Sequence, residues 1–310
     1  MDLIQATLNQ LAFLFGFILI GFVLAKLKTV PANTATALSK LENTLFIPCL
    51  VMGTFSDNFT PEALSSAGSL ILISFIVIAV ATPVAMILAK LSSKDRYRQN
   101  IYIYGLVFAN FAFMGNAVVN SLFPEIFFEY LIFTLPFWFL IYLWGVPVLL
   151  MGDAGEKPTL KQRLKSFVNP MFIGMLLGMA IGLLRIPVPA FLRNIISVSG
   201  SCMSPIAMLL TGMVISTISL KKTFLTPRYY ILSLAKLLLF PGLLLAVSTF
   251  VEIPRAAFVC ALCTQAMPLG MNTIVIPQAI GRDASEGAGL TVISHLLSAI
   301  TIPLMFLFLA

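Results

Sequence analysis

Long apolar stretches separated by short polar connections recur along the whole chain. Most hold about 20 residues or more, which as a helix is enough to cross the roughly 30 Å hydrocarbon layer of a membrane. The pattern predicts ten transmembrane helices, so the sequence indicates an all-α polytopic membrane protein. The expected spans are residues 8–27, 34–56, 64–90, 98–122, 126–151, 167–185, 189–218, 227–250, 254–281 and 285–309.

Composition supports this pattern and excludes a soluble protein. Hydrophobic residues make up 59% of the 310 residues and charged residues only 10%, whereas about 25% of a soluble domain is charged. The longest hydrophilic stretch, residues 152–165, is expected to be a loop, and no segment remains for a soluble domain. The lipid bilayer is therefore the first expected partner.

Basic residues set the expected orientation, because they favour the cytoplasmic side. Asp2 precedes the first apolar stretch and Lys26 and Lys28 follow it, which indicates a retained helix with an outer N-terminus and not a cleaved signal peptide. With ten spans, fifteen basic residues lie at cytoplasmic ends and three at outer ends. We expect a multi-pass inner-membrane protein with both termini outside the cytoplasm. The net charge of +7 is then explained by the basic residues that orient the protein in the membrane, and no nucleic-acid partner is expected.

The sequence repeats weakly at an offset of about 156 residues, and the best match lays residues 108–116 over residues 264–272. A repeat of five spans must be inverted, because an odd number of crossings reverses direction, and inverted repeats are typical of secondary transporters. We expect a first repeat in residues 1–152, a cytoplasmic linker in 153–166 and a second repeat in 167–310, with chance periodicity as the alternative. Further matches are Gly21 with Gly178, Pro48 with Pro205, and Pro147 with Pro303.

The fourth and ninth spans hold most of the polar and helix-breaking residues at mid-depth. Pro268 lacks an amide donor and Gly270 tolerates non-helical dihedrals. Freed backbone groups cannot face lipid, so we expect two broken helices that cross, with second halves starting near Ala117 and Thr273. Their N-termini favour a small anion such as a carboxylate; alternatively, the asparagines only satisfy backbone groups. The predicted substrate-binding residues are Asn110, Met114, Gly115, Asn116, Gln265, Pro268, Gly270, Asn272, Thr273 and, in the second span, Pro48.

Ionisable residues within other spans are costly enough to indicate function. Lys236 could pair with Glu42, snorkel to the interface or supply a fixed positive charge. His295, the single histidine, suits proton coupling, although a histidine that is only hydrogen-bonded within a bundle is commoner. Cys260 and Cys263 have metal or redox spacing but lie in an apolar span, where packed thiols are expected. No metal and no cofactor are predicted.

Three motifs resemble the auxin efflux carrier family, which includes the plant PIN proteins and many bacterial members. They are Leu-Phe-Ile-Pro-Cys-Leu-Val-Met at 45–52, Phe-Ala-Asn-Phe-Ala-Phe-Met-Gly at 108–115 and Gln-Ala-Met-Pro-Leu-Gly at 265–270, and the resemblance covers essentially the whole chain. It implies a ten-helix fold like that of sodium–proton antiporters and bile-acid symporters. Asn110 and Pro268 match the family's crossing residues, whereas Ala117 stands where the family usually has proline.

The same resemblance implies a scaffold of spans 1–3 and 6–8, an elevator-like transport unit of spans 4–5 and 9–10, and homodimers formed through the scaffold. The implied substrates are organic anions such as auxin, malate or malonate. Sequence and resemblance together favour a secondary transporter that moves a small organic anion by alternating access. A proton, sodium or no ion as the co-transported species stays open.

Other function classes compare poorly with this interpretation. A transporter-derived sensor or a channel that uses the same pocket is the alternative. An enzyme is not expected, because intramembrane proteases need paired aspartates, a Ser–His pair or a zinc-binding His-Glu-x-x-His motif. The chain has one histidine and no paired aspartates at mid-depth.

Overall fold

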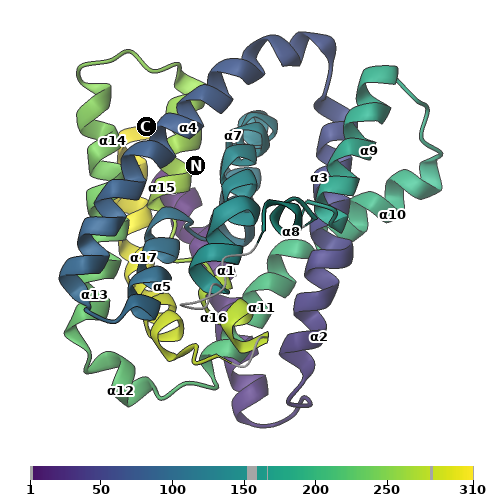
Figure 1. Ribbon diagram of the computed structural model, residues 1–310. Helices are drawn as coiled ribbons and strands as arrows, with labels where there is room; N and C mark the ends of the chain where they lie inside the picture. Colours follow the sequence, from purple (N-terminus) through teal and green to yellow (C-terminus); the bar gives the residue numbers. More distant parts are fainter. Residues whose placement is uncertain (1–2, 152–158, 166, 280–281, 310) are drawn as a thin grey trace.

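The computed structural model describes residues 3–151, 159–165, 167–279 and 282–309. These residues fold into helices joined by short connections, with no β-strand among them (Figure 1). The elements are α1 (Leu3–Lys26), α2 (Thr34–Leu41), η1 (Glu42–Phe46), α3 (Ile47–Asn58), α4 (Pro61–Ser92), α5 (Arg96–Val107), η2 (Phe111–Gly115), α6 (Asn116–Leu122), η3 (Pro124–Ile126), α7 (Phe127–Leu140), η4 (Ile141–Leu150), α8 (Leu160–Lys165), α9 (Pro170–Leu184), α10 (Ala190–Ser201), α11 (Met203–Ile215), α12 (Leu220–Phe224), α13 (Pro227–Leu234), η5 (Ala235–Leu239), α14 (Phe240–Ser248), α15 (Arg255–Ala266), α16 (Asn272–Ala279), α17 (Ser285–Phe306) and η6 (Leu307–Leu309).

Six helical runs among the described residues are long and apolar enough to cross a membrane, and two shorter apolar helices accompany them. The chain is thus an all-α, multi-pass membrane protein, while the count of ten crossings stays a prediction. The expected loop at 152–165 is partly wrong, because Leu160–Lys165 forms helix α8; Asp2 and residues 152–158 lie outside the described residues. The six runs are Ile4–Lys26, Ala67–Ser92, Pro124–Leu150, Ala190–Ile215, Pro227–Ser248 and Ser285–Leu309.

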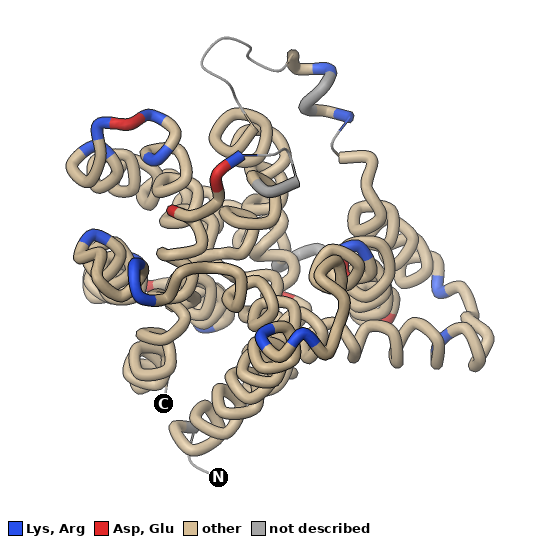
Figure 2. The backbone as a smooth tube through the Cα atoms, turned by 90° about the horizontal axis from the view of Figure 1, so that it is seen from below, with Lys and Arg blue, Asp and Glu red and all other residues tan. Residues whose placement is uncertain are grey.

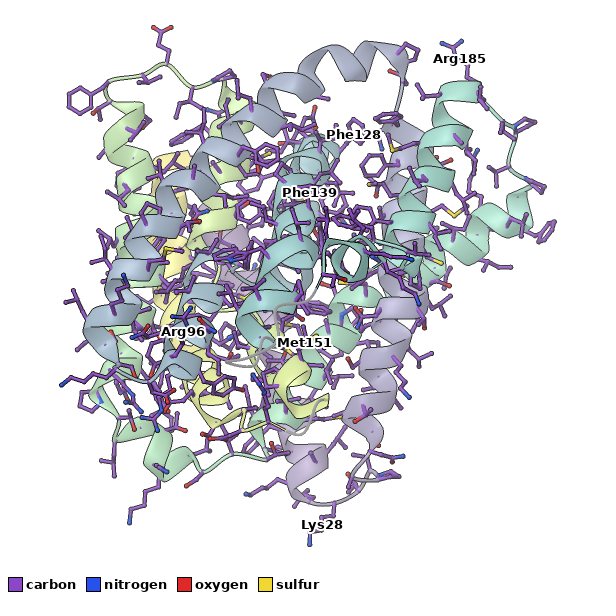
Figure 3. The ribbon with its side chains drawn as sticks, in the orientation of Figure 1. Lys28, Arg96, Phe128, Phe139, Met151 and Arg185 are labelled. Atoms are coloured by element: carbon purple, nitrogen blue, oxygen red, sulfur yellow. The ribbon has the colours of Figure 1, made fainter. Side chains whose placement is uncertain are left out.

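Large apolar side chains cover the outside of the bundle. Leu19, Leu72 and Ile300 are 62%, 61% and 73% exposed, which lipid tolerates and water does not. Charged residues collect instead near the ends of helices, as Lys28 and Arg185 show at opposite ends of the bundle (Figure 3). The view along the bundle in Figure 2 shows helices that are almost free of charge over most of their length. This distribution is what a bilayer requires of a spanning bundle.

Two helix pairs pack so closely that a side chain does not fit between them. A Cβ added to Gly21 of α1 would overlap the carbonyl oxygen of Leu209 on α11, and one added to Gly178 of α9 would lie 2.5 Å from the carbonyl oxygen of Met52 on α3. Small residues permit such contacts between membrane helices. Residues 21 and 178 are 157 positions apart, and so are 52 and 209, so the two contacts correspond.

Candidate functional site

The helical path is interrupted in both segments where the sequence predicts breaks. Helix α5 ends at Val107 and the chain becomes helical again at Phe111, while α15 ends at Ala266 and α16 begins at Asn272. Pro268 contributes to the second interruption, because it has no amide hydrogen to give to the preceding turn. The first interruption, residues 108–110, contains no proline.

The two interrupted stretches lie against each other. Ala109 and Leu269 form an isolated antiparallel bridge, and the amide of Asn110 donates to the carbonyl oxygen of Pro268 over 2.7 Å. A Cβ on Gly270 would lie 3.2 Å from a carbonyl oxygen of the facing stretch, so a larger residue would push the two apart. Backbone groups that leave their helices are therefore paired inside the protein, away from lipid.

The second half of each interrupted segment begins at this crossing. In the fourth segment a π-helical turn, η2, starts at Phe111 and runs directly into α6. The α-helix α6 begins at Asn116, one residue before the start expected near Ala117, and the wide turn ahead of it closes through a 2.9 Å bond from the amide of Gly115 to the carbonyl of Asn110. Helix α16 begins at Asn272, one residue before its expected start. The N-terminal turn of a helix carries partial positive charge, so both positive ends lie at the crossing, although the α16 amides of Thr273 and Ile274 already donate to the carbonyls of Gly270 and Met271.

A cavity of about 230 Å³ lies beside the crossing. Asn43, Asn110 and Asn272 provide its side-chain amides, and none of the described residues that line it carries a charge. The size admits only a small molecule, and the walls suit one with an apolar body and a polar end. The aromatic members of the lining are Tyr104, Phe108, Phe111, Phe113, Trp138 and Tyr142.

Hydrogen bonds fix the orientation of two of the cavity asparagines. Asn272 donates from Nδ2 to the hydroxyl oxygen of Tyr104 over 2.9 Å. Nδ2 of Asn110 lies 3.1 Å from Nε2 of His295, and Nδ1 of the same ring lies 2.7 Å from the carbonyl oxygen of Thr291. Both amides are thus held by side chains far away in the sequence.

Comparison with known proteins identifies the family of the chain. The sequence model of a family described as membrane transport protein matches residues 6–306. The chain belongs to the auxin efflux carrier family. It is therefore a membrane transporter, and the resemblance drawn from its three motifs is confirmed. A search of curated proteins finds no match to this transporter.

The residues predicted to bind substrate separate into two groups in the transporter. Asn110, Gly270 and Asn272 line the cavity, and Pro268 pairs with Asn110 at the crossing. The other predicted residues are not among the lining, because they pack against neighbouring helices. A Cβ on Gly115 would overlap the hydroxyl of Tyr130, and the Thr273 hydroxyl donates to the carbonyl oxygen of Gly270. The Pro48 carbonyl faces Gly174, and Met114 and Asn116 are buried.

Gln265 and Lys236 form a separate buried pair. Lys236 is 0% exposed, and its Nζ donates to Oε1 of Gln265 over 3.1 Å and lies 5.0 Å from the ring centre of Phe240. The expected alternatives, pairing with Glu42 or snorkelling, are both wrong, because η5 packs against α15 whereas η1 packs against α9, α10 and α11. Both carboxylate oxygens of Glu42 are buried without a partner among the described residues.

An ion cluster that the sequence did not predict joins three helices of the transporter. Oε1 of Glu286 on α17 lies 2.6 Å from Nη2 of Arg228 on α13 and 3.2 Å from Nε of Arg98 on α5. The hydroxyl of Tyr102 donates to Oε2 over 2.7 Å. The one sequence signal is that Glu286 lies in the first turn of a helix. An acidic residue there indicates only a favourable interaction with the helix dipole.

Neither the aromatic lining of the cavity nor the position of Asn43 in that lining could be predicted from the sequence. Phenylalanine alone occurs 26 times in the chain, so the sequence does not distinguish an aromatic residue that lines a cavity from the many others in apolar spans. Asn43 lies in the second span, outside the two segments that have breaks. Tertiary packing alone brings these residues to the crossing.

Proposed function

We propose that this transporter is a secondary carrier for a small organic anion, which binds in the cavity beside the crossing. The observation that carries the proposal is the meeting of two half-helix N-termini, η2 and α16, next to a cavity without charged side chains. Free amides and partial positive charge at helix N-termini bind anions. A carboxylate, which only accepts hydrogen bonds, matches these donors.

The lining favours one carboxylate on an apolar or aromatic body, as in auxin. The rings of Phe108, Phe111 and Trp138 offer stacking and edge contacts to such a body. A second carboxylate, as in malate or malonate, would lie against these rings without a counter-ion, and burial of an unpaired charge is costly. Dicarboxylates are therefore the less favoured substrates of the proposal.

Transport by alternating access follows from an inverted repeat, which is part of the proposal. The corresponding contacts of Gly21 with Leu209 and of Gly178 with Met52 support it, because exchange of the two repeats maps one contact onto the other. We assign α1–α4 and α9–α14 to a scaffold, and α5–α7 with α15–α17 to a transport unit that moves like an elevator. A homodimer formed through the scaffold, an inner-membrane location and outer termini complete the proposal.

A sensor or a channel that uses the same cavity is the second candidate. A sensor binds the anion without moving it, and a channel conducts it without saturable exchange. Counterflow separates the three, because only a carrier accelerates uptake of labelled anion when unlabelled anion is loaded on the opposite side.

The test begins with thermal stabilisation of the purified transporter by indole-3-acetate, benzoate and malonate, followed by counterflow in liposomes. Asn110→Ala and Asn272→Ala remove hydrogen bonds to a charged ligand, each worth about 1.5–3 kcal/mol, so binding should weaken roughly 10- to 150-fold. The exposed Asn194→Ala is the matched control and should bind normally. Normal counterflow in both cavity variants, or no stabilisation by any of the acids, would refute the proposal.

A further inference from the structure

The hydrogen bonds around His295 determine which of its nitrogens carries the proton. The ring is buried on α17, with Nδ1 2.7 Å from the carbonyl oxygen of Thr291. A carbonyl oxygen only accepts, so Nδ1 carries hydrogen, and in the neutral ring Nε2 is then an acceptor. The group 3.1 Å from Nε2 must donate, which fixes the side chain of Asn110 with Nδ2 toward the ring.

This orientation leaves the amide oxygen of Asn110 in an unusual position. Oδ1 is buried and has no hydrogen-bond partner among the described residues, although Asn110 lines the cavity. An unpaired buried acceptor costs free energy. It is also the wrong polarity for an anion, because both the amide oxygen and a carboxylate only accept hydrogen bonds. With a neutral histidine, a carboxylate placed against Oδ1 of Asn110 would therefore meet an acceptor, while one N–H of Nδ2 is taken by the ring.

We propose that His295 is a positioning residue whose protonation reverses the amide of Asn110 and so couples one proton to each bound carboxylate. A proton from water adds to the lone pair of Nε2, which becomes a donor. The amide of Asn110 then turns so that Oδ1 accepts from Nε2 and Nδ2 is released to donate to the carboxylate. The inference rests on the proposed function and identifies the coupling ion of the same site.

The coupling is mutual because each partner relieves a cost of the other. A charged imidazole is expensive in a buried site, and an anion beside it offsets that cost. A carboxylate beside the position of Oδ1, in turn, meets a donor there and a nearby positive charge after His295 has bound its proton and the amide has turned. By linkage, the proton and the anion strengthen each other's binding by the same factor. A monocarboxylate that enters with one proton adds no net charge to the moving site.

Among the described residues, the two charged side chains that are buried on α17 or on elements packed against it already have partners. Lys236 donates to Gln265, and Glu286 is held by Arg98 and Arg228. Asn110 and Thr291 are the described hydrogen-bond partners of the ring, which therefore lies on α17 beside the interruption that follows α5. The buried titratable side chains on α17 and on elements packed against it are Tyr102, Tyr104, Tyr229, Lys236, Cys260, Cys263 and Glu286.

Because the chain has a single histidine, ¹⁵N-histidine labelling gives one imidazole whose tautomer and charge NMR reads directly. We expect the neutral ring with hydrogen on Nδ1 in the free transporter at pH 7.5, and conversion to imidazolium when saturating indole-3-acetate is added. Asn110→Ala should leave the free tautomer unchanged and abolish the conversion, whereas the control Asn194→Ala should keep it. A ring with hydrogen on Nε2, or a ring that stays neutral with bound anion, would overturn the inference.

The pH profile of binding is the second readout. Over pH 6–8 indole-3-acetate is fully ionised, so its affinity for the transporter should fall by up to tenfold per pH unit on the alkaline side. His295→Gln keeps a hydrogen-bonding amide but cannot titrate, and it should bind with a flat profile. A flat profile in the wild type refutes the coupling alone. Failure of indole-3-acetate, benzoate and malonate to bind at any pH refutes the proposed function, and the coupling falls with it.

Discussion

Truncation of Arg228 should destabilise the transporter more than truncation of Arg98, although both arginines bind the same oxygen of Glu286. The Arg228 contact is shorter, 2.6 Å against 3.2 Å, and its side chain is 33% exposed against 45% for Arg98. Shorter distance and lower exposure both strengthen an ion pair. Arg228 is also the only one of the two that lies on a scaffold helix in the proposed assignment.

The exposures set the magnitude of the two losses. Removal of one partner of a fully buried pair costs about 3–5 kcal/mol, and an exposed pair contributes at most about 1 kcal/mol. Glu286 is 8% exposed, but both arginines reach solvent. After discounting for screening, we expect about 1–2 kcal/mol for Arg228→Ala and about 0.5–1 kcal/mol for Arg98→Ala.

Unfolding of the purified protein in detergent measures both losses, and double-mutant cycles with Glu286→Gln isolate the two pair energies. The exposed Arg193→Ala is the control and should leave stability unchanged. Counterflow adds a second readout: the Arg228 pair must break when the proposed transport unit moves, so Arg228→Ala should exchange anion faster, and Arg98→Ala should not. A larger loss for Arg98→Ala, or a coupling of Arg228 to Glu286 near zero, would refute the reasoning.

Two further predictions test packing and orientation. Gly178→Ala places a methyl group 2.5 Å from the Met52 carbonyl oxygen and should lower the free energy of unfolding by about 1–3 kcal/mol. The control Gly16→Ala has open space around it and should leave that free energy unchanged or raise it by up to about 1 kcal/mol. Equal effects of the two substitutions would contradict the contact. With the partly buried Cys49 and Cys202 replaced, Glu252→Cys should react with an impermeant maleimide on intact spheroplasts and Asn33→Cys only after permeabilisation. The reverse pattern would invert the orientation.

The apolar pattern predicted the helical segments well, because residue type alone decides whether a stretch can face lipid. The breaks were also visible: Pro268 and Gly270 carry backbone chemistry that a sequence displays directly. The path at the first break was not visible, because the π-helical turn Phe111–Gly115 that precedes α6 has no proline or other marker in the sequence. Such a turn depends on packing and leaves no mark in composition.

Pairing between distant residues was the part that the sequence could not supply. Asn110 and His295 were both singled out, but their contact joins positions 185 residues apart, and nothing in either segment points to the other. Pairing of Lys236 with Glu42 was one of the alternatives because opposite charges attract, yet the buried surroundings of each are set by the helices that cover it. The ion cluster of Glu286 could not be predicted, because its arginine partners lie on other helices.

The central claim is that a carboxylate binds where the two interrupted helices cross. An experimental structure of the transporter with 5-bromoindole-3-acetate tests it most directly, because the bromine marks the position and orientation of the acid. The account predicts the carboxylate beside Asn110, within hydrogen-bonding distance of the first amides of η2 or α16, and the bromine among the aromatic rings. Bromine density beside the Lys236–Gln265 pair, or anywhere away from the crossing, would contradict it.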